Sequence, residues 1–182
     1  MKIANYQAFA LSTAIYRELP GGDSPSYPAM GLAGETGEVC EKLADGTLGE
    51  ELAKELGDVL WYIANLSKDM GESLSCLAEA EDFSSLQAAL PGSGATSDAA
   101  LRLAGKAGKV CEITKKLIRD DGNRLTDRRR VAILSALSET LVAFCRLIDS
   151  LGLDLDAVAE ANADKLRSRQ RRGQIKGDGD NR

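Results

Sequence analysis

Apolar residues recur along residues 49–70 with the spacing of one helix face. The stripe consists of leucine, valine and isoleucine positions three or four residues apart, namely Leu52, Leu56, Val59, Leu60, Ile63 and Leu66. Such a stripe is typical of a helix that packs one face against a core. Gly71 follows it in the position of a helix-ending residue. Comparable patterns between turn-forming residues predict helices over residues 3–18, 28–43, 49–70, 73–90, 98–119, 127–151 and 154–169.

The composition agrees with an all-α fold. Hydrophobic residues make up 43% of the 182 residues, and only 4% of the chain is aromatic. Leucine and alanine dominate, and both favour helices. Polar residues interrupt the apolar stretches before the roughly 20 positions that a bilayer requires, and the first residues lack the features of a signal peptide. We therefore expect a cytoplasmic protein with no membrane partner.

Charge and the absence of one residue type exclude several functions. The net charge of −5 makes the chain a poor candidate for nucleic-acid binding, which depends on a basic surface. The sequence contains no histidine. This excludes Ser-His-Asp triads, zinc-histidine sites and the Glu-x-x-His pairs of di-iron helical bundles.

The chain contains a degenerate internal repeat. Residues 20–41 align without gaps with residues 91–112 and match at 11 of 22 positions. Residues 55–71 align with 136–152 at an offset of 81 rather than 71. We infer a tandem duplication of a helical hairpin, with one unit at 1–72, a degenerate second unit at 73–170 and a polar, glycine-rich tail at 171–182.

Four acids stand in pairs on two neighbouring predicted helices. Glu35 and Glu38 are three residues apart, and Glu55 and Asp58 repeat that spacing. Residues at i and i+3 share a helix face, so an antiparallel hairpin brings both pairs together. Unpaired carboxylates repel one another, and Mg²⁺ or Mn²⁺, which prefer oxygen ligands, would relieve that repulsion. The alternative is that these acids are solvated charges on helix surfaces.

The second repeat weighs against that alternative. There Glu35 and Glu38 are replaced by Lys106 and Lys109, and Glu55 by Ala136, whereas Asp58 retains an acidic counterpart in Glu139. Glu41 persists as Glu112, which suggests a structural or supporting role. In the first copy, Gly34, Gly37 and Gly57 flank the acids, and each costs helix stability relative to alanine. Close helix approach or room for a ligand would explain them.

The segments GLAGETGEVCEK and ELAKELGDVLWYIANL resemble the MazG-like, all-α nucleoside triphosphate pyrophosphohydrolases. The family pattern ExxE…ExxD matches Glu35, Glu38, Glu55 and Asp58. The resemblance implies a MazG-like helical bundle that binds Mg²⁺ or Mn²⁺ through these four acids and hydrolyses a (d)NTP to the (d)NMP and pyrophosphate. Glu38 or Glu41 would also orient the attacking water.

Basic residues of the second half are candidates for holding phosphate. The pseudo-symmetry of the repeats would place the two lysines that replace Glu35 and Glu38 near the metal site. The basic segment that follows them resembles one found in single-module relatives. The candidates on this helix are Lys106, Lys109, Lys115, Lys116 and Arg119. Alternatively, the last three form a solvated helix end that complements the helix dipole. Lys165 and Arg169 match the late segment of the family and are further phosphate candidates.

Base and sugar contacts are expected from Trp61, Asn65 and Asn162, although the pattern favours the core for Trp61. Residues 177–181 would fold over the nucleotide or form a free terminus. The resemblance leans toward phage MazZ-type proteins that convert dGTP or GTP to the monophosphate, which would place the chain in the host cytoplasm. Hydrolysis of dUTP, dCTP or damaged nucleotides is the alternative reaction, and a non-catalytic helical binding module is the alternative class. Related single-module enzymes build their sites from paired hairpins, so the two fused copies could mimic that pair within one chain. We expect one metal site per chain and further self-association as a homodimer or homotetramer.

Overall fold

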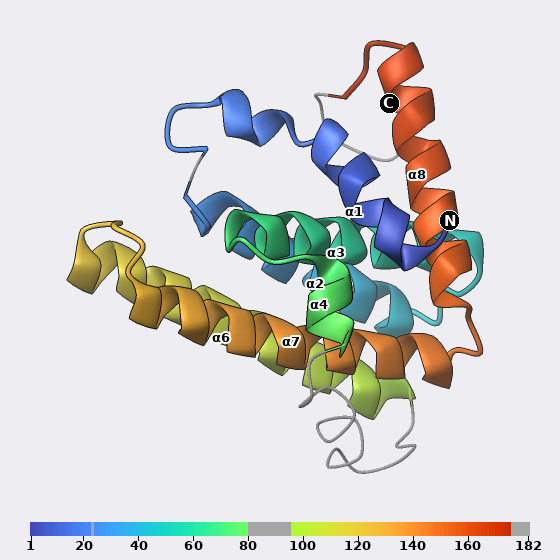
Figure 1. Cartoon of the computed structure of the whole chain (residues 1–182). Helices are drawn as coiled ribbons and strands as arrows, with labels where there is room; N and C mark the ends of the chain where they lie inside the picture. Colours follow the sequence, from blue (N-terminus) through green and yellow to red (C-terminus); the bar gives the residue numbers. More distant parts are fainter. Residues whose placement is uncertain (23, 80–95, 176–182) are drawn as a thin grey trace.

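The computed structural model of the chain describes residues 1–22, 24–79 and 96–175. All regular elements in these ranges are helices, as Figure 1 shows. They are α1 (Ile3–Ser12), the 3₁₀ helix η1 (Ile15–Glu18), α2 (Ser26–Ala44), α3 (Glu50–Asp69), α4 (Leu74–Glu79), α6 (Thr96–Asp121), α7 (Asp127–Ser150) and α8 (Leu155–Arg171). The predicted all-α fold is confirmed.

Five predicted helices agree with α2, α3, α6, α7 and α8 to within two residues at either end. Gly71 ends α3 as expected, with a positive φ of 85°. The amide of Glu72, the residue after it, donates to the carbonyl of Ser67 at 3.0 Å. Of the helix predicted over 73–90, residues 74–79 are helical, and 80–90 lie outside the described residues. Residues 177–181 also lie outside them.

The prediction of one continuous helix over residues 3–18 is wrong. Helix α1 stops at Ser12, and the backbone turns through Thr13 and Ala14 into η1. The Thr13 hydroxyl donates to the carbonyl of Ala10 at 2.8 Å and accepts the indole N–H of Trp61 at 2.8 Å. The turn also buries Tyr16, whose hydroxyl donates to Asp69 at 2.6 Å. Tertiary contacts thus override a helical pattern.

The helices form a bundle of two hairpins, α2–α3 and α6–α7, which meet through α2 and α6. Helices α1 and α8 cover α3, while α4 lies against α3 and α7 (Figure 1). One apolar cluster extends through both hairpins, so the repeats share a core. The division at residue 72 stays a prediction. Helix α8, which follows the second hairpin in sequence, packs on α3 of the first.

Helix α7 is the one described helix whose length and composition would allow it to cross a membrane, contrary to the expectation that polar residues interrupt every such stretch. More than half of its apolar segment is buried inside the bundle. Its buried side chains include Ile133, Leu137, Phe144 and Leu147. A core helix of a globular protein has these same properties, so this feature is weak evidence for a membrane span.

Candidate metal centre

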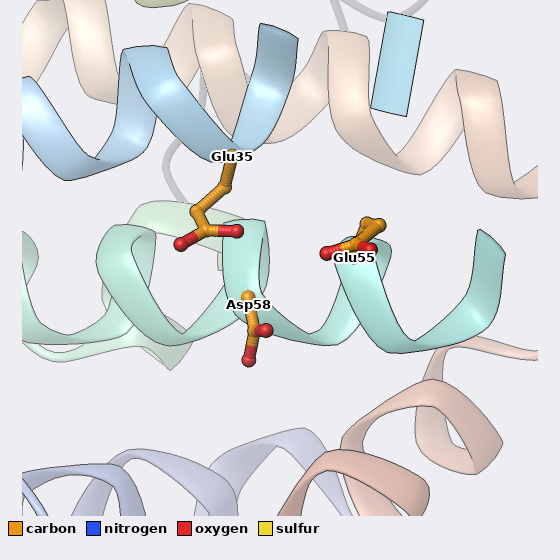
Figure 2. A group of neighbouring side chains, drawn as sticks. All are labelled: Glu35, Glu55 and Asp58. Carbon is orange, nitrogen blue, oxygen red and sulfur yellow. The ribbon is translucent and has the colours of Figure 1, made fainter. Parts of the chain in front are cut away.

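Three of the four predicted metal ligands converge between α2 and α3. Glu35 extends from α2 toward α3, which carries Glu55 and Asp58 (Figure 2). Each offers a carboxylate oxygen, and these oxygens lie within 4.8 Å of one another. The short connection between the helices allows this approach, because Gly46 and Gly49 adopt positive φ angles of 73° and 74° that L-residues rarely take.

The fourth predicted ligand, Glu38, lies outside this group on the exposed side of α2. It is close enough that its charge helps to raise the pKa of Glu35. Glu41, one turn further along, is also exposed. The metal-binding and water-orienting roles of these two residues stay predictions.

Two lysines partly balance the acidic cluster. Glu55 is only 3% exposed and forms an ion pair with Lys42 at 3.1 Å. Asp58 pairs with Lys165 of α8, whose side chain is 10% exposed. Burial, followed by the charges of Asp58, Glu38 and Glu55, raises the pKa of Glu35 from about 4.5 to about 8, and Lys165 opposes this shift. Burial and the neighbouring carboxylates therefore disfavour the ionised form of Glu35 in the ion-free protein.

A chain of buried polar groups orients Asp58. The Tyr6 hydroxyl of α1 donates to Asn162 Oδ1 at 2.6 Å, and Asn162 Nδ2 donates to Asp58 Oδ1 at 2.8 Å. Tyr6 and Asn162 are both almost fully buried. Outer contacts of this kind fix the direction of a ligating carboxylate. The predicted contact of Asn162 with base or sugar stays a prediction; in the structure its side chain holds Asp58, a predicted metal ligand, in place.

The acids fit a hard divalent cation. Their donor atoms are all carboxylate oxygens, which Mg²⁺ and Mn²⁺ prefer. Burial and, after it, repulsion between the acids raise the pKa of Glu35, and a bound ion would offset both by favouring the ionised form. Glu35, Glu55 and Asp58 would be the ligands from the described cluster. Of the flanking glycines, Gly34 and Gly37 face open space, because a β-carbon added at either would meet nothing within 4 Å. This leaves room beside Glu35 and Glu38.

An aromatic cavity of about 130 Å³ opens beside the acids. Glu35 and Asp58 form part of its wall, together with Tyr27, Trp61, Tyr62 and Arg169. The sequence predicted Trp61 here but missed Tyr27, whose ring stacks on Tyr16 at 4.7 Å. Asn65, the other predicted base contact, does not line this cavity. It is fully buried, and its Nδ2 donates to the carbonyl of Trp61 in the same helix at 2.9 Å.

A basic groove of about 380 Å³ lies on the other side of Lys165, between α3 and α8. The basic residues that line it are Lys54, Lys165, Arg169 and Arg172. Lys165 and Arg169 were predicted phosphate ligands. Lys54 and Arg172 were missed, although their spacing gives a signal: Lys54 is four residues before Asp58, and Lys165, Arg169 and Arg172 share one face of α8.

The basic residues of α6 have contacts elsewhere. Lys106 forms an ion pair with Glu139 at 2.6 Å, and Lys116 pairs with Glu112 at 3.3 Å. Lys115 also pairs with Glu112, and Arg119 pairs with its neighbour Asp120. Lys109 is exposed. None of the ion pairs in the described part of the chain joins these five residues to the acidic cluster. Their predicted role in phosphate binding stays a prediction.

The raised pKa of Glu35 leads to a prediction for the metal-free protein. Because the folded-state pKa lies above the unfolded value, this carboxyl stabilises the fold fully below about pH 4 and loses that contribution as the pH rises through about 8. Glu35→Gln should raise the metal-free melting temperature at pH 8.5 by a few degrees and change it little at pH 5. Thermal unfolding in EDTA at both pH values measures this, with the exposed Glu51→Gln as control. Equal effects of Glu35→Gln at both pH values would contradict it.

Comparisons with known proteins agree with the site. Residues 24–78, which include all four predicted ligands, match the family model of the MazG nucleotide pyrophosphohydrolase domain. The chain is also 38% identical over 92 residues to the Gene 37 protein of Mycobacterium phage L5, covering 43% of this chain and 81% of that protein. No solved structure matches the chain.

Proposed function

We propose that this chain, which belongs to the MazG-like family of nucleotide pyrophosphohydrolases, hydrolyses a (deoxy)nucleoside triphosphate to the monophosphate and pyrophosphate with Mg²⁺ or Mn²⁺. The observation that carries the proposal is the convergence of Glu35, Glu55 and Asp58 within 4.8 Å. The oxygen of a water molecule would form a bond to the α-phosphorus. The bond from that phosphorus to the oxygen bridging to the β-phosphorus would break, and pyrophosphate would leave with this oxygen.

A bound divalent ion would neutralise part of the charge of the triphosphate and lower the pKa of the attacking water. The chain's own residues supply the rest. Glu35, Glu55 and Asp58 would hold the ion, and Asn162 would keep Asp58 in position. A carboxylate of α2, Glu38 or Glu41, would orient the water and accept its proton.

The surroundings of the acids support one orientation of the nucleotide. The aromatic cavity lined by Tyr27, Trp61 and Tyr62 is suited to a base or sugar, because aromatic faces stack on bases. The basic groove lined by Lys54, Lys165, Arg169 and Arg172 is suited to the β- and γ-phosphates. Arg169 lines both hollows, and Lys165 of the groove pairs with Asp58 of the cavity, so the α-phosphate would lie beside the acids between them.

The test is product analysis with purified protein, Mg²⁺ or Mn²⁺, and a panel of dGTP, GTP, dATP, dUTP and dCTP. We expect pyrophosphate and the monophosphate as products, with dGTP or GTP preferred on the resemblance to MazZ-type proteins. Preference for dUTP, dCTP or oxidised nucleotides would favour a housecleaning role instead. Release of single phosphate would contradict the reaction, and no release from any nucleotide would favour a non-catalytic binding module.

Lys165 provides a test of the basic groove. Lys165→Met should raise the KM for the nucleotide at least about tenfold, because charge-assisted contacts to phosphate contribute about 1.5–3 kcal/mol. Steady-state kinetics with Mn²⁺ measure this change. Lys116→Met is the matched control, since Lys116 pairs with Glu112 on α6. A larger effect of Lys116→Met than of Lys165→Met would place the phosphates on α6, as the sequence alone suggested.

We further propose that the protein acts in the cytoplasm, as a homodimer or homotetramer, without a membrane or nucleic-acid partner. The apolar core shared by the two hairpins supports a soluble unit, and self-association is proposed on the resemblance to the family alone. Light scattering coupled to size-exclusion chromatography measures the oligomeric state, and a monomer at micromolar concentration would contradict self-association.

A further inference from the structure

The two hairpins are related by a local pseudo-twofold axis that passes between α2 and α6. The Cys40 thiol of α2 donates to the carbonyl of Ala100 in α6 at 3.8 Å, and the Cys111 thiol of α6 donates to the carbonyl of Ala29 in α2 at 3.0 Å. Cys111 is the counterpart of Cys40, and Ala100 is the counterpart of Ala29, at the repeat offset of 71. The same contact is thus made twice with the roles exchanged, which is the property of an isologous interface.

The helices that follow the hairpins obey the same relation. Gly71 after α3 and Gly152 after α7 both have positive φ angles, 85° and 67°. The helix after each of these turns contacts the other hairpin, because α4 packs on α7 as well as on α3, and α8 packs on α3. The pseudo-symmetry therefore extends over the structural framework of the acidic site, and its counterpart can be located on α6 and α7.

The counterpart of the acidic cluster is an internal ion pair. Lys106 stands at the position of Glu35, and Glu139 at the position of Asp58. Lys106 Nζ lies 2.6 Å from Glu139 Oε2, and both side chains are about one-third exposed. The counterpart of Glu55 is Ala136, a buried residue without any charge.

We propose that the α6–α7 hairpin holds a silenced second metal site, in which the Lys106 ammonium has replaced the divalent cation. In the first site, three carboxyl groups offer oxygens within 4.8 Å of one another, which is a donor set that suits a divalent cation. In the second, one carboxylate faces one ammonium, and the pair is neutral without any ion. A primary amine has no lone pair for a metal while it is protonated, and its charge repels a cation.

Two consequences follow for this chain. It binds divalent metal at one hairpin only. Its second hairpin packs on the first as the hairpin of a symmetry-related partner would. Lys106 is a structural replacement for an ion, which differs from the phosphate-binding role that charge reversal alone suggested. Because the silenced site rests on the proposed metal site of the first hairpin, the experiment must separate a failure of that site from a failure of the counterpart.

The test is restoration of the second site, measured by Mn²⁺ binding with electron paramagnetic resonance and calorimetry on the full chain. The background variant E55Q/D58N, which lacks the first site, should bind no Mn²⁺. Adding K106E/A136E to this background places three carboxylates on α6 and α7 and should restore about one Mn²⁺ per chain. The wild-type protein should bind its Mn²⁺ at the first hairpin alone.

The outcomes are distinguishable. If the wild-type protein binds no Mn²⁺, the proposed function is wrong. If it does bind Mn²⁺ and the folded E55Q/D58N/K106E/A136E variant binds none, the silenced site is wrong. Circular dichroism establishes that each variant is folded.

A double-mutant cycle keeps the inference testable if the multiple variant does not fold. Lys106→Met and Glu139→Gln should each lower the melting temperature of the wild-type chain, and the double variant should lower it by less than the sum of the two. Additive losses would show that Lys106 and Glu139 are not coupled, and would overturn the replacement of an ion by this pair.

Discussion

Replacement of Glu55 by glutamine, or of Asp58 by asparagine, is expected to lower pyrophosphate release by about a thousandfold or more. Charge stabilisation by a catalytic metal contributes several kcal/mol to the transition state, and each 1.36 kcal/mol changes the rate tenfold. Both residues lie on α3 with Glu35 close by. Each substitution keeps the size of the side chain and removes the charge that holds the ion.

Metal affinity and activity should fall together in these variants. Initial rates at saturating Mn²⁺, together with Mn²⁺ binding by calorimetry, separate loss of the ion from loss of the chemistry. Glu51→Gln is the matched control, because Glu51 lies on the same helix but is exposed and outside the cluster. It should retain wild-type affinity and rate. Full activity of Glu55→Gln would remove this residue from the site and contradict the proposed centre.

Much of the first site could be predicted from sequence, because its information is local. Spacing of three residues places Glu55 and Asp58 on one face of α3, and the short loop after α2 determines how the two helices pair. The glycines were more ambiguous. Close helix approach explains Gly57, where a β-carbon would meet Asn162 of α8. Room for a ligand is the explanation that suits Gly34 and Gly37, which face open space.

Contacts across long sequence distances could not be predicted in the same way. Tyr6 reaches Asn162 over 156 positions, and Lys165 reaches Asp58 over 107. Nothing in the local pattern of α1 distinguishes Tyr6 from any other buried aromatic residue. The break at Thr13 has the same origin, since the Trp61 side chain that binds it comes from α3.

Pseudo-symmetry was a better guide to architecture than to side-chain contacts. It correctly anticipated paired hairpins, but it could not show that Lys106 pairs with Glu139 within the second hairpin. The phosphate role assigned to the lysines of α6 stays a prediction. The cross-over of α8 onto α3 supplies basic residues to the first site from a different helix, which an alignment of repeats cannot show.

Gly57→Ala is expected to damage both the fold and the site through one added methyl group. A β-carbon at this position would lie 2.7 Å from Cβ and 2.9 Å from Nδ2 of Asn162. The nearest atom, Cβ, is attached directly to the backbone of α8, so relief requires movement of that helix away from α3. Overpacking of this kind costs about 1–3 kcal/mol. The movement would also loosen the contacts of Asn162 and Lys165 with Asp58.

Activity should fall together with stability, by about 10- to 100-fold, which is the usual effect of losing an outer contact to a metal ligand. Chemical denaturation and pyrophosphate release measure the two losses. Gly105→Ala in α6 is the matched control, since a β-carbon there meets nothing within 4 Å and α6 lies outside the acidic cluster. That variant should gain about 0.5–1 kcal/mol of stability, because alanine favours a helix over glycine, and keep its activity. If Gly57→Ala were instead as stable and active as Gly105→Ala, the contact between α3 and α8 would not position Asp58, and Asn162 would have no part in the metal centre.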